Sequence, residues 1–134
     1  MKSNSQASVE YMIIVGFVTF LVIIIIGMAY FYSDLIKDKI KINQAETFAV
    51  QLINSAESVF FSGEPSKTLV RLYLPENVRS VEINSDSIVI NISTSSGFNI
   101  RAFTSKVPLQ GNISSSPGVK IFSIEAKNNY VLIS

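Results

Sequence analysis

Hydrophobic and polar residues divide this chain into three regions. The first contains residues 11–32, a run of 22 residues that carries no formal charge. A helix of that length is roughly 33 Å long at about 1.5 Å per residue, which is enough to cross a bilayer core of about 30 Å. The pattern therefore predicts a membrane-spanning helix near the N-terminus.

From residue 33 the apolar positions recur at steps of three and four residues, as on one face of a helix. The predicted apolar stripe consists of Leu35, Ile36, Ile40, Ala45, Phe48, Ala49, Leu52, Ile53, Ala56, Val59 and Phe60. Because no proline occurs before Pro65, we expect one continuous helix from about residue 6 to residue 61, with residues 33–62 as its amphipathic part. Gly63 can supply a left-handed cap at its end.

The third region, residues 63–134, alternates apolar and polar residues, which is typical of strands. The predicted strands are residues 68–74, 78–84, 87–93, 98–104, 120–126 and 130–134. Short connections with turn residues favour an antiparallel meander, with one face on the helix stripe. The other face is expected to carry Arg71, Glu82, Asn91 and Arg101. Residues 107–116 contain Pro108 and are expected to form a loop or an edge. The predicted fold class is α+β.

Composition limits the chemistry that the chain can perform. It contains no cysteine, histidine or tryptophan, so cysteine nucleophiles and zinc sites of the Cys/His type are excluded. The acidic residues of the third region are scattered, and no G-x-S-x-G motif occurs. A net charge of +1 without a basic stripe gives no indication of nucleic-acid binding. We therefore expect no enzyme, no catalytic residues, no metal and no cofactor.

The apolar run differs from a cleaved secretory signal. Such signals have an apolar region of about 7–15 residues followed by a small-residue cleavage site. Here the run is longer, and no clear A-x-A site follows it, so retention of the segment is favoured. Lys37, Lys39 and Lys41 favour a cytoplasmic C-terminus, whereas Asp34 and Asp38 lie among them and later N-x-S sequons favour an external one. The flanking charges leave both orientations open.

A short motif precedes the apolar run. Gln6-Ala7-Ser8-Val9-Glu10, after a five-residue leader, resembles the Q-x-S-x-E motif of archaeal type IV pilins with class III signal peptides. The resemblance implies that a prepilin peptidase cuts between Ser5 and Gln6, which makes residues 1–5 a cleaved leader. It covers under a tenth of the chain. Ile14 stands where the family has leucine, and Ser5 stands where related pilins often have glycine.

The resemblance also implies a function and a set of partners. The chain would be a structural subunit of an archaeal adhesion-type pilus, a homopolymer held together by the helix of residues 6–32. Its partners would be copies of itself, the prepilin peptidase, an assembly ATPase and a membrane platform. It would reside in the cell membrane before assembly and in an extracellular pilus afterwards, with residues 63–134 as the surface domain. The alternative is a single-span anchor for an extracellular β-domain that does not polymerise.

Glu10 has two interpretations. As an interfacial residue, it lies at the level of the lipid headgroups, where a carboxylate costs less than the about 2.5–3.5 kcal/mol expected at mid-bilayer. As an assembly residue, it neutralises the new amine of Gln6 on a neighbouring subunit when both leave the lipid. The motif positions Gln6, Ser8 and Glu10 are thus the candidate processing and assembly residues.

Two N-x-S sequons are candidate glycosylation sites, although sequons often occur without modification. Asn112 belongs to a Gly/Ser-rich loop, which makes it the better acceptor. Asn91 lies in a predicted strand, where it can be modified only if its side chain faces solvent.

Overall fold

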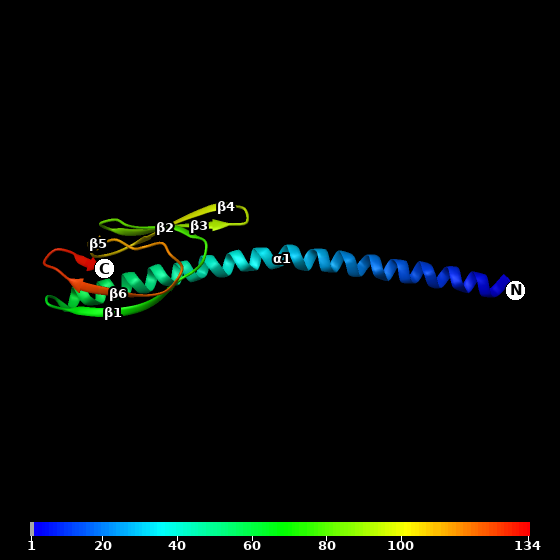
Figure 1. Cartoon of the computed structure of the whole chain (residues 1–134), viewed down its shortest axis with the longest axis horizontal. Helices are drawn as coiled ribbons and strands as arrows, with labels where there is room; N and C mark the ends of the chain where they lie inside the picture. Colours follow the sequence, from blue (N-terminus) through cyan, green and yellow to red (C-terminus); the bar gives the residue numbers. More distant parts are fainter. Residues whose placement is uncertain (1) are drawn as a thin grey trace. The chain divides into compact units, whose positions relative to one another are not determined.

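A computed structural model describes the backbone of residues 2–134 and the side chains from residue 4 onward (Figure 1). Met1, the first residue of the expected leader, lies outside the described residues. The chain forms one helix followed by strands, and it divides into two compact units, one ending at Lys37 and the other comprising Asp38–Ser134. The elements within residues 2–134 are α1 (Lys2–Ser62), β1 (Lys67–Leu74), β2 (Val78–Ile83), β3 (Ser87–Thr94), β4 (Gly97–Thr104), β5 (Leu109–Gly111), β6 (Gly118–Ala126) and β7 (Val131–Ile133).

The first unit contains the N-terminal part of α1. Every side chain from residue 4 to residue 32 is exposed, including all the apolar side chains of the uncharged run. The helix is long and apolar enough to cross a membrane, as the hydropathy pattern predicts. This segment is compatible with membrane anchoring.

The second unit is built on the C-terminal part of α1, whose buried stripe is shorter than the sequence predicts. Ala45, Phe48, Ala49, Leu52, Ile53, Ala56 and Val59 are buried. Leu35, Ile36 and Ile40, which were expected to belong to the stripe, are 45%, 56% and 50% exposed. The helical periodicity is correct, but the core of the second unit begins at Ile42, so Leu35, Ile36 and Ile40 are not part of it.

The end of α1 is the one that the sequence predicts. Gly63 has a φ of 77°, in the left-handed region that glycine adopts without steric cost. Its N–H donates to the carbonyl oxygen of Phe60 at 3.1 Å, which satisfies one of the carbonyls left open at the helix terminus. The chain then turns into β1.

The strands form two sheets, where the sequence suggested one meander. β2, β3 and β4 are consecutive antiparallel neighbours, as expected from their short connections. The other sheet has the order β1-β6-β7-β5, in which β1 pairs with β6 and β5 pairs in parallel with β7. The meander is therefore wrong for this sheet, because β1 pairs with β6, a strand distant in sequence, and β5 pairs in parallel with β7. The expected loop or edge near Pro108 contains β5, which is an edge strand.

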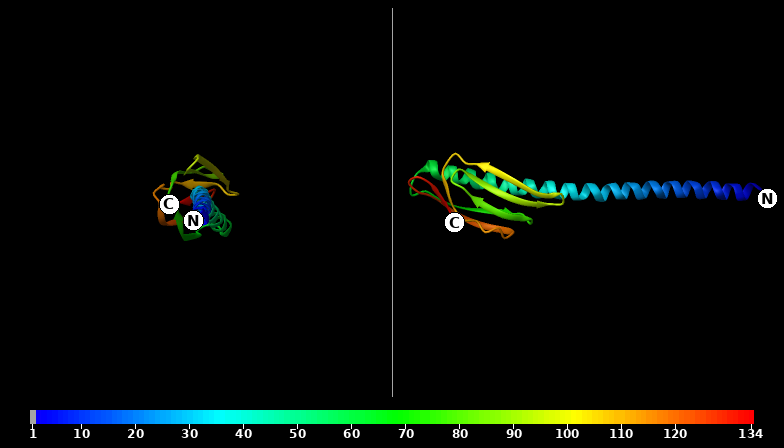
Figure 2. Two further views of the ribbon diagram at one scale, coloured as in Figure 1. Left: turned by 90° about the vertical axis from the view of Figure 1, so that its right-hand side faces the viewer. Right: turned by 90° about the horizontal axis from the view of Figure 1, so that it is seen from above.

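Both sheets turn one face to the helix within the second unit. Figure 1 shows β1 and β6 on one side of α1 and β2, β3 and β4 on another side, and the right-hand view of Figure 2 shows strands running alongside the helix. Phe48 of α1 packs edge-to-face on Phe122 of β6, with ring centroids 5.7 Å apart. Ile88, Ile90 and Ile92 of β3 are buried in the same core. The α+β prediction of a long N-terminal helix packed on C-terminal, mainly antiparallel sheets is thus confirmed.

One residue of the expected polar face lies on the opposite side of its sheet. Arg101 pairs with Ile90, and Ile100 pairs with Asn91. Because directly paired residues share a face, Arg101 lies on the side of the buried Ile90, while Ile100 lies on the outer face. The arginine remains exposed since β4 is an edge strand that the core does not cover fully. The placement predicted for Arg101 is therefore wrong.

Candidate functional site

The processing and assembly residues predicted from the motif lie in the first turns of α1. Ser5, Gln6, Ser8 and Glu10 are all helical and exposed. The expected cleavage bond, between Ser5 and Gln6, lies inside the helix, because α1 begins at Lys2. The sequence analysis expected the helix to begin at about residue 6. In the structure the helix begins earlier and includes the expected cleavage bond.

Gln6 and Glu10 lie one helical turn apart on one face. Together with Ser5 and Val9 they line a shallow depression on the helix surface. A spacing of four residues brings the Gln6 and Glu10 side chains above one another on the same face of the helix. Glu10 places one carboxylate directly before the apolar segment.

The apolar segment has no polar stripe. Tyr11, Met12, Ile13 and Ile14 are 69%, 70%, 66% and 60% exposed, and these successive positions point in different directions around the helix. A helix that is hydrophobic all round requires an apolar environment on every side. Lipid acyl chains and a bundle of neighbouring helices both meet this requirement.

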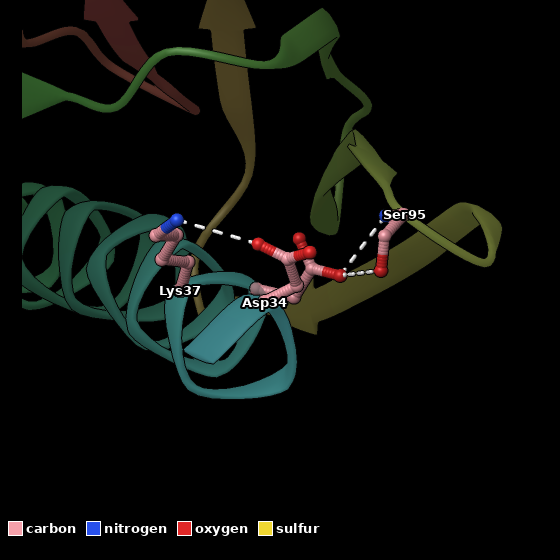
Figure 3. Close-up of polar contacts among 4 residues, drawn as sticks. Asp34, Lys37 and Ser95 are labelled. Carbon is pink, nitrogen blue, oxygen red and sulfur yellow. Dashed lines mark hydrogen bonds and ion pairs between the residues drawn. The ribbon is translucent and has the colours of Figure 1, made fainter. Parts of the chain in front are cut away.

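A carboxylate at the start of the second unit holds the β3–β4 turn. The backbone N–H of Ser95 donates to Asp38 Oδ2 at 2.9 Å, and the Ser95 hydroxyl donates to the same oxygen (Figure 3). These two hydrogen bonds lower the pKa of Asp38 below its ordinary value, because they stabilise the ionised form. Figure 3 also shows the surface ion pair of Lys37 with Asp34, at 3.3 Å in the first unit.

A second helix carboxylate holds the other end of β4. Glu57 Oε1 accepts a hydrogen bond of 3.0 Å from the backbone N–H of Lys106, directly after the strand. Asp38 and Glu57 thus fix both ends of an edge strand to α1. The sequence analysis missed both roles. The sequence does contain one indication for Glu57, because it is the only charged residue between Glu46 and Glu64.

The two sequons differ in their surroundings. Asn112 is exposed and follows β5 in the connection to β6. Asn91 lies on the outer face of β3 and is partly buried, and its Oδ1 is buried with no hydrogen-bond partner. A buried polar atom without a partner costs about 1–3 kcal/mol. The geometry therefore favours Asn112 as the accessible acceptor.

The outer faces of both sheets carry apolar side chains that the sequence analysis did not single out. On β1 and β6, Leu69 and Ile121 are 69% and 66% exposed. On β4, Phe98 and Ile100 are exposed beside the guanidinium of Arg79, which lies 4.3 Å from the Phe98 ring centroid. The sequence already indicates these exposed apolar residues, because segments such as TLVRLYL place apolar residues on both faces of a strand.

No other chemical centre emerges from the described part of the chain. Among residues 2–134, no group of three or more Asp and Glu residues is placed to hold a metal ion. Comparisons with protein-family models, with curated proteins and with solved structures find no match to this chain. The candidate functional features are therefore the charged helix end, the apolar helix and the outer faces of the β-domain.

Proposed function

We propose that this protein is a structural subunit of an archaeal type IV adhesion-type pilus. The single observation that carries the proposal is the helix of residues 11–32, exposed and apolar on all sides, with Glu10 and Gln6 one turn apart at its start. Such a helix can exchange lipid contacts for contacts with neighbouring copies without exposing a polar face. The α+β architecture, with a separate β-domain on the later part of α1, is consistent with this role.

The proposal includes processing and assembly. A prepilin peptidase cleaves between Ser5 and Gln6, and the apolar segment remains on the mature subunit. Before assembly the subunit resides in the cell membrane. An assembly ATPase with a membrane platform then adds it to an extracellular homopolymer. No catalytic residue, metal, cofactor or nucleic acid is part of this proposal.

Glu10 gives the polymer its axial register in this proposal. When a subunit leaves the membrane, its carboxylate enters a helix bundle of low dielectric constant, where an unpaired charge is costly. The amine that cleavage creates on Gln6 of a neighbouring subunit provides the partner. Each new subunit is then favoured at the one axial position where the two charges meet.

A charge-neutral substitution tests this role. Glu10→Gln retains the shape of the side chain and leaves the Gln6 and Ser8 motif positions intact, so cleavage should proceed. Filament yield should fall at least tenfold, because the neighbouring amine loses its partner. The matched control is Glu46→Gln, an exposed position on the same helix with no role in the proposal. Electron microscopy and mass spectrometry of sheared surface fractions provide both measurements.

Normal filament yield from Glu10→Gln would contradict the assembly role. A subunit that remains full length in the membrane, with no filament in the unsubstituted strain, would favour the alternative of a single-span anchor for an extracellular β-domain. The two outcomes are distinguishable because the first retains the cleavage and the second lacks it.

We propose further that the pilus is glycosylated at Asn112 and unmodified at Asn91. The exposed position of Asn112 supports the first part, and the partial burial of Asn91 within β3 supports the second. Peptide mapping of native protein tests both, and absence of added mass on the Asn112 peptide would contradict the proposal.

A further inference from the structure

Two exposed apolar patches lie on different sheets of the β-domain. The β1/β6 patch contains Leu69, Arg71, Tyr73, Val119 and Ile121. Arg71 pairs with Ile121, and Tyr73 pairs with Val119, so these side chains share the outer face. The opposite faces of both strands bury Leu72 and Phe122 in the core. The patch is therefore an apolar surface with one cationic group at its centre.

The β4 patch contains Phe98 and Ile100, with Arg79 over the Phe98 ring and Glu82 on β2, which β3 separates from β4 in the same sheet. Ile100 pairs with Asn91, and Asn91 pairs with Ser80, which places these residues in one row of the outer face. Glu82 pairs with Val89 in the next row of that face. Arg79 is held on the Phe98 ring, so Glu82 supplies an anionic group with no ion pair among the described residues.

We infer that the β1/β6 patch of one copy of this protein docks on the β4 patch of the next copy. Exposed apolar surface on a β-domain that already has its own core indicates an interaction site. Charge complementarity identifies the partner, because Arg71 and Glu82 have opposite signs and both are exposed without an ion pair in the described residues. Contact of the β1/β6 patch with itself would instead bring two Arg71 side chains toward each other.

The position of the patches determines the kind of assembly. Figure 1 places β4 on a different side of α1 from β1 and β6, so the two patches face different directions within the second unit. An interface between two different surfaces of the same chain is heterologous, and it continues from copy to copy unless the rotation closes a ring. The inference rests on the proposed function and deepens it, because it names the surfaces through which the β-domains of neighbouring subunits contact each other in the filament.

Cysteine cross-linking tests the contact directly, because the natural chain contains no cysteine. The full-length variant with Ile121→Cys and Ile100→Cys is treated with a short bismaleimide in native membranes and on surface filaments. We expect a ladder of covalent oligomers on a denaturing gel. Each single variant should give monomers, since a heterologous contact never brings two identical positions together. The matched control combines Ile100→Cys with Asn128→Cys, an exposed position outside both patches, and should also remain monomeric.

A charge exchange provides an independent readout. In the double-cysteine background, Arg71→Glu should remove the ladder, dimers included, and Arg71→Glu with Glu82→Arg should restore it. Dimers from either single-cysteine variant, or filaments that yield no ladder, overturn the inference and leave the filament proposal intact. A ladder in membranes of cells that form no filament supports the contact and overturns the filament proposal.

Discussion

Two carboxylates on α1 have a structural role that depends on their position relative to β4. Asp38 accepts both hydrogen bonds from Ser95 before the strand, and Glu57 accepts one from Lys106 after it. As an edge strand, β4 has a neighbouring strand on one side only. The two carboxylates therefore fix β4, and with it the β4 patch, to the helix.

Removal of the Ser95 hydroxyl should be visible in the ionisation of Asp38. We expect Ser95→Ala to raise the pKa of Asp38 toward its ordinary value, because the largest cause of the lowered pKa is the hydrogen bond from this side chain. The measurement is the pH titration of the Asp38 carboxyl carbon by NMR. Ser96→Ala, the adjacent exposed position in the same turn, is the control and should leave the pKa unchanged.

The same pKa direction determines how stability depends on pH. A lowered pKa in the folded state means that folding stabilises the ionised form of Asp38. Its contribution is fully present above the unfolded-state pKa of about 4 and is lost as the pH falls through the lower, folded-state pKa. Ser95→Ala should therefore reduce the loss of stability on acidification. An unchanged pKa in Ser95→Ala would contradict the proposed hydrogen bonds.

The element that contributes most to the core of the β-domain is the buried stripe of α1. Phe48 is 1% exposed and packs edge-to-face on Phe122. We expect Phe48→Ala to lower the free energy of unfolding of the β-domain by about 3–5 kcal/mol, because it leaves a cavity at the contact between helix and sheet. Chemical denaturation of the full chain in detergent micelles, followed by spectroscopic signals from the strands, measures the change.

Phe61 provides a matched control on the same helix. It is 72% exposed, so Phe61→Ala should change the free energy of unfolding by less than about 0.5 kcal/mol. Equal effects of the two substitutions would contradict the assigned stripe.

The sequence predicts which segments are strands better than it predicts which strands pair with one another. Alternation identifies β1 and β6 as strands, since each has one buried and one exposed face. It gives no information on their pairing, which joins Leu72 to Lys120 across a long stretch of chain. Local turn signals report only neighbouring strands, so the β2-β3-β4 meander was predictable and the β1-β6-β7-β5 order was not.

The candidate site divides in the same way. Gln6, Ser8 and Glu10 are identified by a short motif, and the apolar segment by uniform hydropathy, because both signals are local in the sequence. The β1/β6 patch depends on the register of two distant strands, and the contacts of Asp38 and Glu57 depend on the placement of β4. Such features exist only after the sheets have formed.

At the scale of the whole molecule, the chain combines two parts that require different environments. The first unit exposes apolar side chains on all sides and needs lipid or other copies of itself. The second unit has its own core and an exposed surface with charged residues and two apolar patches. A subunit that moves from membrane to polymer meets both requirements.

The mass of the subunit in purified surface filaments tests this account most directly. Intact-mass and N-terminal peptide analysis of filaments seen by electron microscopy should identify a chain that begins at Gln6 and retains the whole apolar helix. The leader of residues 1–5 should be absent. A chain that retains Met1, found only in the cell membrane and in no filament, would contradict the central claim that α1 passes from lipid to a polymer of its own copies.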